Sequence, residues 1–497
     1  MNRTNFTALW ICLLFAFVAT FGAAMIFWLE RGNPHKLTLR TPTEGDIRGE
    51  TVVETPAGGL TEPVLTKGPG LASTLPGEWP GFRGAMRDNI TTTPTPLARD
   101  WSDPVRRPKR LWSVRLGEGH AGAAVRNGRV YLVDYDEEQY ADAIRCLSLD
   151  NGAELWCYRY PQYIVNNHGR TRTVPAIGTT GSGNTARTFV VSLDPKGVLF
   201  CNDAETGELH WMIDLVKRYE TKVPDWYAGQ CPLIDGERVI IAPGGPEAMF
   251  VALNLADGTE LWRTPNPSGF LMSHASIAPV SSTVTEDTVT GDTVTAWDTY
   301  VWCGEGGVAA VAASDGRLLW ETRLWKVSTA TVASPVPLPG GDLFLSGGYK
   351  SGAMRLGLTL ADNGSMTPHE VWRLIFRTIE AEQHTPILYD GFIYAVRKQD
   401  PQLVCLDPQS GTLRWESGRS HRMGNGYGPF LLADGVLLLL DDRTGELIMA
   451  EATPDEYREL GRCEVIPECS NAWAPMALAD HRILLRDETR LFCIELP

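Results

Sequence analysis

The stretch Cys146–Trp156 reads Cys-Leu-Ser-Leu-Asp-Asn-Gly-Ala-Glu-Leu-Trp, and its pattern recurs along most of the chain. A small residue begins each copy, a Gly-containing turn follows, and a Trp stands ten residues after the small one. The other clear copies begin at Cys201, Ala252, Ala310 and Cys405. A looser copy with inserted residues ends at Trp372. Because Gly supplies the positive φ of a tight turn, each copy predicts a β-hairpin whose outer strand carries the large Trp ring.

A second hairpin signal precedes several copies of this pattern. Asn-Gly or Asp-Gly stands between alternating apolar residues at Asn127, Asp235, Asp390 and Asp434. These dipeptides favour the tight turn that joins two antiparallel strands. Each unit therefore predicts four antiparallel strands, A to D, and successive tryptophans of these units lie 43 to 58 residues apart. Four-stranded units at this spacing are typical of β-propeller blades.

The two ends of this region set the number of blades. The outer strands counted in this way contain Trp112, Trp156, Trp211, Trp262, Trp320, Trp372, Trp415 and, in place of a missing Trp, Tyr457. Residues 109–114 resemble an outer strand with no blade before it, and 482–485 and 491–496 resemble strands B and C with no strand D after them. We expect the N-terminal strand to complete the last blade and close the ring, which removes an exposed edge.

The sequence thus predicts an all-β, eight-bladed β-propeller of four-stranded antiparallel blades over residues 109–497. Seven blades are the alternative, if the copy that ends at Trp372 is only a decorated loop. Residues 283–295 alternate Thr and Val around Gly-Asp. This pattern predicts a projecting two-stranded ribbon in blade four.

The first thirty residues carry a membrane signal. Residues 6–29 include no charged side chain, and as a helix they would extend over about 36 Å, more than the ~30 Å hydrocarbon core of a bilayer. We predict a retained transmembrane signal anchor, with a cleaved signal peptide as the alternative. Residues 30–78, rich in Pro, Thr and Gly, indicate a linker. The expected location is the cell membrane, single-pass, with the propeller on the periplasmic or extracytoplasmic side, although the flanking charges do not decide the orientation.

The composition limits the class of partner. The chain has 497 residues, with 45 Lys and Arg against 60 Asp and Glu, and a formal net charge of −15. Nucleic-acid binding needs clustered cations that neutralise phosphates, so no nucleic-acid partner is expected. Hydrophobic residues make up 43% and charged residues 21%, an ordinary globular balance that excludes wholesale disorder.

The repeated phrase, a small residue followed by Leu, Asp, a Thr-Gly turn and Trp, resembles the pyrroloquinoline-quinone-like (PQQ-like) propeller repeat. The segment 79–108 begins Trp-Pro-Gly-Phe-Arg-Gly and is similar to the head segment found before many bacterial propellers of this kind. The family includes quinoprotein alcohol and glucose dehydrogenases, and also a non-catalytic outer-membrane assembly lipoprotein that binds proteins and no quinone. The resemblance is closer to the latter, and it implies the fold rather than an activity.

The residues that quinone chemistry needs are not evident. The alcohol dehydrogenases of the family usually carry two adjacent cysteines and a Ca²⁺ held by carboxylate and amide oxygens, whereas no two of the ten Cys here are adjacent. The densest acidic cluster, Asp134, Asp136, Glu137, Glu138 and Asp142, lacks the spacing of a Ca²⁺ loop and indicates a solvated turn. Glu380, Glu382 and Asp225 fall in loops between blades without an evident partner. We therefore expect no catalytic residue, no metal ligand and no cofactor, with PQQ and Ca²⁺ as the alternative.

The cysteines have a structural explanation. Four of them occupy the strand-C site that holds Ala252 and Ala310 in other copies, and these are Cys146, Cys201, Cys405 and Cys493. A small buried residue fits this site, and a free Cys behaves as a small hydrophobe. Two disulfides are candidates, Cys146–Cys157 across a turn and Cys463–Cys469 within a short loop. No Cys or His spacing points to zinc or haem.

The D–A loops of a propeller surround one end of its central channel, and we call the aromatic and imidazole residues expected there the mouth. The mouth residues are His120, Trp226, Tyr227, His274, His384, Tyr427 and Trp473. Aromatic and imidazole groups are typical of binding surfaces, and side chains that only fill the channel are the alternative. Two long loops, 158–173 and 216–228, add Asn166, Asn167, His168, Arg170, Arg172, Lys217 and Arg218, and predict a basic rim that attracts anionic partners.

These patterns favour a membrane-anchored, extracytoplasmic propeller that acts as a non-catalytic scaffold and binds a protein or polymer ligand at the mouth. The alternative is a PQQ-dependent quinoprotein dehydrogenase that oxidises alcohols or sugars. A hydrolase or lyase is disfavoured, because no nucleophile and base stand at a recognisable spacing.

Overall fold

The computed structural model describes residues 59–92, 96–281, 283–286, 293–362 and 365–497, together with Phe17, Thr20 and Phe21. The chain divides into two compact units, Met1–Val52 and Val53–Pro497, and the propeller lies in the second. Apart from those three residues, the predicted membrane segment 6–29 lies outside the described part of the chain, as does the predicted linker up to residue 58. Within the described part, no helix is both long and apolar enough to cross a membrane.

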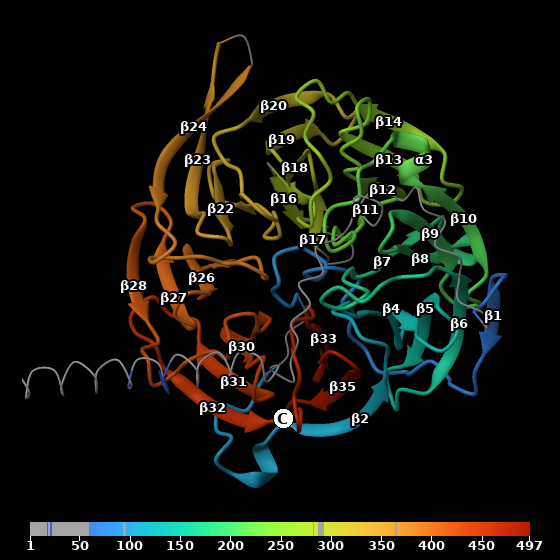
Figure 1. Ribbon diagram of the computed structural model, residues 1–497, viewed down its shortest axis with the longest axis horizontal. Helices are drawn as coiled ribbons and strands as arrows, with labels where there is room; N and C mark the ends of the chain where they lie inside the picture. The colour runs from blue at the N-terminus through green and yellow to red at the C-terminus, as the bar shows by residue number, and fades with distance from the viewer. Residues whose placement is uncertain are drawn as a thin grey trace, which may run out of the picture. The chain divides into compact units, whose positions relative to one another are not determined.

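Eight antiparallel sheets are arranged around a central axis, each with an inner strand near the axis and an outer strand at the rim (Figure 1). From the inner to the outer strand, blade 1 contains β3 (Ala124–Arg126), β4 (Arg129–Asp136), β5 (Ala141–Ser148) and β6 (Glu154–Pro161), and blade 2 contains β7 (Ala176–Thr180), β8 (Arg187–Leu193), β9 (Val198–Asp203) and β10 (Leu209–Asp214). Blade 3 contains β11 (Leu233–Asp235), β12 (Arg238–Ile241), β13 (Phe250–Asn254) and β14 (Glu260–Thr264). Blade 4 contains β15 (Ala278–Val280), β18 (Thr299–Gly304), β19 (Gly307–Ala312) and β20 (Leu318–Thr322).

In the same order, blade 5 contains β21 (Val336–Pro337), β22 (Leu343–Gly347), β23 (Gly352–Leu360) and β24 (Met366–Leu374), and blade 6 contains β25 (Ile387–Tyr389), β26 (Phe392–Arg397), β27 (Gln402–Asp407) and β28 (Thr412–Glu416). Blade 7 contains β29 (Phe430–Ala433), β30 (Val436–Leu440), β31 (Glu446–Glu451) and β32 (Glu459–Glu464). Blade 8 contains β33 (Ala477–Ala479), β34 (Arg482–Arg486), β35 (Arg490–Glu495) and β2 (Lys109–Arg115). The described helical turns are η1 (Pro104–Arg106), η2 (Gly183–Thr185) and α3 (Leu215–Tyr219). The prediction of eight blades rather than seven is confirmed, because the loose copy that ends at Trp372 forms a complete sheet.

Blade 8 is assembled from two distant parts of the chain. Strand β2, which precedes blade 1 in the sequence, pairs antiparallel with β35, and Trp112 stands opposite Cys493. The strand order β2-β35-β34-β33 makes β2 the outer strand of this sheet. The two ends of the propeller segment therefore meet in one blade.

Part of the expected linker is built into the propeller. Strand β1 (Val64–Lys67) pairs with β6 as a fifth strand outside blade 1, with Val64 opposite Arg159. Pro63 and Pro69 flank β1 without interrupting it. An edge strand tolerates such neighbours, because its outer side forms no ladder bonds. The linker that the sequence predicts up to residue 78 therefore ends before β1.

Every outer strand places one residue at the same register position. In blade 1, Trp156 lies opposite the small Cys146, and the register shifts beside this pair so that Leu155 is skipped. The same β-bulge occurs at this position in all eight blades. A bulge increases the local twist and re-aims the side chain next to it. The repeated motif therefore encodes a bulged outer strand.

The indole of each such Trp contacts the following blade. Trp156 Nε1 donates a hydrogen bond of 3.1 Å to the carbonyl of Ala204 in blade 2. Equivalent bonds join Trp112 to Leu149, Trp211 to Leu255, Trp372 to Pro408 and Trp415 to Thr453. The ring also covers the turn glycine of that blade, since a Cβ on Gly207 (φ +74) would lie 2.5 Å from Trp156. Trp and Gly thus recur together because they form one contact between neighbouring blades.

Blade 7 corrects one element of the sequence prediction. The register position of the missing Trp is held by Gly461, opposite Met449, whereas Tyr457 lies before the start of β32. A Cβ on Gly461 would lie 3.0 Å from the ring of Trp101, which is buried. The head segment 79–108 therefore supplies an indole to this blade from a distant part of the sequence. The prediction of Tyr457 as the substitute is wrong, because Gly461 follows its partner Met449 by twelve residues, whereas Trp156 follows Cys146 by ten.

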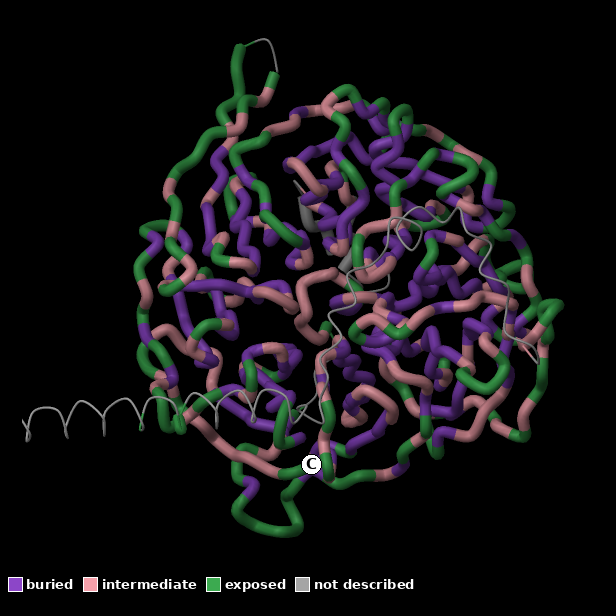
Figure 2. Tube along the Cα trace, in the orientation of Figure 1, coloured by how far each residue is buried: buried purple, intermediate pink, exposed green. Residues whose placement is uncertain are grey.

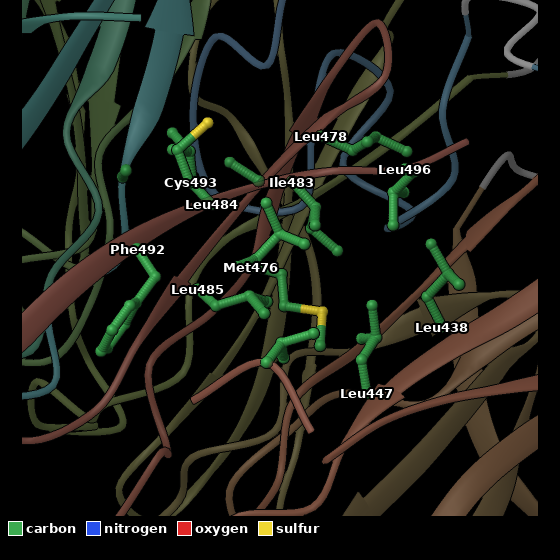
Figure 3. Packing of buried hydrophobic residues seen from close by; sticks show 14 of the residues in the cluster. Leu438, Leu447, Met476, Leu478, Ile483, Leu484, Leu485, Phe492, Cys493 and Leu496 are labelled. Carbon is green, nitrogen blue, oxygen red and sulfur yellow. The ribbon is translucent and has the colours of Figure 1, made fainter. Parts of the chain in front are cut away.

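The hydrophobic core lies between neighbouring sheets rather than at one centre. Buried residues concentrate in the inner and middle strands, while the rim is exposed or half-buried (Figure 2). Leu438 and Leu447 of blade 7, for example, belong to the same buried cluster as Met476, Ile483 and Leu484 of blade 8 (Figure 3). Each such cluster removes apolar area from water at roughly 25 cal/mol per Å². Packing between blades therefore stabilises the fold.

The described cysteines are all free thiols. Cys157 stands opposite Arg145, next to the Cys146–Trp156 pair, so Cys146 and Cys157 project to opposite faces of blade 1. The candidate Cys146–Cys157 disulfide is therefore wrong, and Cys463 and Cys469 are free as well.

The predicted ribbon is confirmed, because β16 (Thr283–Glu286) pairs antiparallel with β17 (Thr293–Ala296) between β15 and β18.

Candidate functional site

The first part of the head segment crosses the centre of the ring (Figure 1). Trp79 bridges to Val125 in the inner strand of blade 1, and Pro80 accepts a backbone hydrogen bond from Ile177 in blade 2. Ile90 lies beside Leu432 in the inner strand of blade 7. This segment therefore fills the axis between the inner strands and forms the floor beneath the mouth.

Arg83 fixes the head segment to blade 6. Its guanidinium donates to the carbonyls of Thr385 at 2.9 Å and Pro386 at 3.1 Å, directly before β25. It also donates to the carbonyls of Arg87 at 2.8 Å and Asp88 at 2.9 Å within its own segment. Burial lowers the pKa of Arg83 to about 10, so the group stays charged at neutral pH. Sequence reasoning missed this role, because the two partners of Arg83 in blade 6 are backbone atoms about 300 residues away.

Four mouth residues form a continuous chain of contacts. The His120 ring stacks on Trp473 with ring centres 4.7 Å apart, and Tyr427 lies 5.1 Å from Trp473 on a tilted plane. His384 Nε2 is 2.8 Å from the carbonyl of Tyr427. His120 is buried, whereas the other three are half-buried and keep part of their surface open. The structure thus brings together residues from the loops before blades 1, 6, 7 and 8.

The other mouth residues lie around Arg172. The Arg172 charge lies close enough to His120 and to His274 to act on both rings, and Tyr227 interacts with Arg172 in turn. The Tyr227 hydroxyl donates to the carbonyl of Val165 at 2.9 Å. Trp226 precedes Tyr227 in the same loop and is half-buried, but no ring contact joins it to the other six within the described part of the chain. The mouth therefore forms one aromatic face, with Trp226 beside it.

Carboxylates at the mouth were not assigned a partner from the sequence. Glu382 accepts a hydrogen bond of 3.1 Å from the Tyr427 hydroxyl, and Asp442 accepts one of 3.2 Å from Trp473 Nε1. Lys398 Nζ lies 3.4 Å from the centre of the Tyr427 ring, a cation–π contact. Asp442 and Lys398 follow strands B, whose loops reach the same end of the blade as the D–A loops. No local motif marks them, so only the strand assignment could have located them.

The expected basic rim is largely neutralised by its own neighbours. Arg170 pairs with Glu137 at 2.6 Å, Lys217 with Asp214 at 2.9 Å, and Arg218 with Glu260 at 3.5 Å. Arg172 donates to the carbonyls of Asn167, His168 and Gly169. Most charged groups of this rim are therefore paired with nearby carboxylates or directed at the backbone, and the attraction of anionic partners stays a prediction.

The mouth histidines are neutral at physiological pH. Burial lowers the pKa of His120 to about 3, that of His274 to about 4 and that of His384 to about 4. The nearby Arg172 adds to the effect on His120 and His274. An unfolded chain binds these protons near pH 6.5. As the pH falls, the unfolded state therefore takes up protons before the folded state does. The contribution of these histidines to the free energy of unfolding is lost between about pH 6.5 and pH 4.

The free energy of unfolding of a His384→Gln variant is expected to fall less than that of the wild type when the pH is lowered from 7 to 5. The amide keeps a donor for the Tyr427 carbonyl but takes up no proton on unfolding. Comparison with wild type is needed because buried Asp194, whose pKa is raised to about 6 by burial, shifts stability in the opposite direction. Urea midpoints at both pH values measure the effect, with the exposed His369→Gln as control. Equal pH dependence of wild type and His384→Gln would contradict the assignment.

The residues of this face do not fit a Ca²⁺-bound quinone. Within the described residues, no group of three or more His, Cys, Asp or Glu side chains could hold a metal ion. Glu382 and Asp442 accept hydrogen bonds from the Tyr427 hydroxyl and the Trp473 indole. The acidic cluster that the sequence presented as solvated is instead internally paired, because Asp134 and Asp136 bind Arg145 and Arg159. Asp142 is fully buried against the Tyr160 hydroxyl, and burial raises its pKa well above the usual range.

Comparison with known proteins decides the family. A family model described as outer membrane protein assembly factor BamB matches residues 141–417. The chain belongs to this family. The BamB of Yersinia pestis is 22% identical over 384 residues, which span 73% of this chain and 85% of that protein. The sequence resemblance to the PQQ-like propellers, on the BamB side, is thereby confirmed.

Solved structures share the fold of this BamB-family chain. The quinohemoprotein alcohol dehydrogenase of Comamonas testosteroni matches with a TM-score of 0.53 and 13% identity, covering 85% of this chain and 81% of that one. A europium-containing methanol dehydrogenase matches with a TM-score of 0.54 and 10% identity, covering 85% and 98%. At such identities the likeness concerns architecture alone.

Proposed function

We propose that this protein is a non-catalytic scaffold for outer-membrane protein assembly, and that it binds a protein partner at the mouth. Family membership is the observation that carries this proposal, because the matching model and the Yersinia relative are both described as outer membrane protein assembly factors. The mouth supports it by its composition, since half-buried Tyr and Trp rings beside hydrogen-bonding groups are typical of protein-binding surfaces.

The rigid support of the mouth favours a preformed binding surface. The Trp473 and Tyr427 side chains are each held by a carboxylate, through Asp442 and Glu382, and Arg83 supports the loop that carries His384. Such preorganisation lowers the entropy lost on binding. We further propose that segment 6–29 is a membrane anchor that keeps the propeller on the periplasmic side. We also propose that the β2–β35 pairing is the contact that closes the ring.

Site-specific crosslinking in cells tests the proposed surface. A photoreactive phenylalanine analogue at Tyr427 is expected to crosslink a discrete outer-membrane assembly partner. The matched position is Met212 on β10, the outer strand of blade 2, where the side chain is 52% exposed. A Trp473→Ala substitution is expected to reduce the Tyr427 crosslink at least fivefold, while Trp473→Phe, which keeps an aromatic ring, retains most of it. Equal crosslinking from Tyr427 and Met212, or none from Tyr427, would refute the mouth as the binding surface.

A further inference from the structure

A second concave surface lies at the opposite end of the blades from the mouth. Strand β2 begins here at Lys109, and after β2 ends at Arg115 the chain continues to His120 in the mouth. The cavity has a volume of about 820 Å³ and lies between the segment before β2 and blade 8. We call it the β2 groove, and it is lined by Leu75, Pro104, Val105, Arg107, Pro108, Lys109, Arg110, Asp480, His481, Arg482, Glu495, Leu496 and Pro497.

The charge of the β2 groove is opposite to that of the whole protein. Four of its lining residues are Arg or Lys, of which Arg482 is paired with Asp150 at 3.5 Å, and two are Asp or Glu, whereas the chain carries a net charge of −15. Lys109 and Arg110 are exposed, and neither forms an ion pair within the described part of the chain. The paired cations of the mouth rim behave differently, since they are matched by carboxylates nearby. The groove therefore retains positive charge that is available to a ligand.

The outer wall of the groove is held in place from both sides. The segment before η1 is fixed by buried Trp101, which packs over Gly461 of blade 7. Arg107 Nε donates to the Trp101 carbonyl at 2.8 Å, and the Asp103 carboxylate accepts the Val105 amide at 3.0 Å. On the inner wall, Arg482 donates to the Leu149 carbonyl at 2.7 Å. A groove with fixed walls loses little entropy when a ligand enters.

The groove also presents apolar surface next to its cations. Val105 is 88% exposed and Pro104 is exposed beside it, whereas Pro108 and Leu496, which line the same space, are themselves buried. A free inorganic anion would not use this surface. A concave site also fits an extended polypeptide better than it fits the flat surface of a bilayer. Proteins that bind a bilayer through cations present those cations on a convex surface. Mixed charge and apolar contact in a groove therefore favours a polypeptide.

We propose that the β2 groove binds an extended acidic segment of a protein partner. Lys109 and Arg110 pair with its carboxylates, and Val105 contacts its apolar side chains. Electrostatic attraction of this kind raises the association rate and weakens with salt. Because the groove and the mouth lie at opposite ends of the blades, both can be occupied together. This second site stands independently of the function proposed for the mouth.

Binding of a labelled peptide to the purified full-length chain tests the proposal. The probe is a fluorescent ten-residue peptide of Glu and Asp with two Leu, and the comparison peptide carries Gln and Asn in place of the acids. Fluorescence anisotropy at 50 and 300 mM NaCl measures both. We expect the acidic peptide to bind at least tenfold more tightly than the neutral one at low salt, and to weaken at high salt. Equal affinity for the two peptides, or no binding of the acidic one, would overturn the proposal.

Charge reversal locates the site. Lys109→Glu with Arg110→Glu is expected to reduce affinity for the acidic peptide at least tenfold. The matched control, Lys222→Glu with Arg317→Glu, changes the net charge equally at exposed positions outside the groove and should leave affinity within twofold. A Trp473→Ala variant should also leave it unchanged, which separates this site from the mouth. If the reversal weakens sedimentation with anionic phosphatidylserine vesicles but not peptide binding, the surface serves a membrane and the proposal fails.

Discussion

Replacing Arg83 by Met is expected to lower the free energy of unfolding by about 3–5 kcal/mol. The guanidinium donates to four carbonyls, two of them in its own segment and two at the start of blade 6. Met fills a similar volume but leaves these buried acceptors without donors. Each lost charged hydrogen bond and each unsatisfied carbonyl adds to the cost. The substitution should also loosen the floor beneath the mouth.

Chemical denaturation of the full-length chain, followed by tryptophan fluorescence, measures this loss. Arg317→Met serves as the control, because it makes the same chemical change at an exposed position. The control is expected to shift stability by less than about 0.5 kcal/mol. Arg83→Lys should fall between the two, since an ammonium keeps the charge but lacks the planar fork that reaches four acceptors. A loss below 1 kcal/mol for Arg83→Met would contradict the role described for this residue.

Gly207→Ala is the second change with a large expected effect. The added methyl group would lie 2.5 Å from the Trp156 indole, and the backbone at this position has φ +74. The positive φ costs about 1–2 kcal/mol for a residue with a Cβ, and overpacking adds roughly 1–3 kcal/mol. The total loss should therefore be about 2–5 kcal/mol.

Gly391→Ala separates the two contributions. Gly391 has a similar φ of +80, but nothing lies within 4 Å of its added Cβ. It should lose only the backbone part, about 1–2 kcal/mol. Combining Gly207→Ala with Trp156→Leu should recover part of the overpacking cost, because a smaller side chain makes room for the methyl group. If Gly207→Ala and Gly391→Ala are equally destabilised, the Trp–Gly contact does not hold neighbouring blades together.

The repeat was readable from the sequence because its determinants are local. A small residue, a turn glycine and a Trp within eleven positions define a hairpin, and the structure shows why the Trp and the Gly recur together. The same local view failed in blade 7, where Gly461 makes room for Trp101 from a distant segment. Strand β1 was missed for a related reason, since an edge strand needs little hydrophobic patterning of its own.

The candidate site was predictable in position but not in charge. Counting blades placed His120, His384, Tyr427 and Trp473 at one end, and three mutual contacts now join them. The charge balance depends on pairs such as Arg170 with Glu137, whose partners come from separate loops. No spacing rule in a single sequence reveals such pairs. The β2 groove escaped detection likewise, because it is formed between a surface segment and blade 8.

The joining of β2 to β35 has a consequence for how the chain is made. Translation delivers β2 before any complete blade, yet its pairing partner is among the last residues to emerge. Successive hairpins can fold as they appear, because the strands of blades 1 to 7 are each contiguous in the sequence apart from added β1. Strand β2 must wait throughout with its hydrogen-bonding edge unused, open to wrong pairing. A nascent or truncated chain is therefore the species that most needs a chaperone.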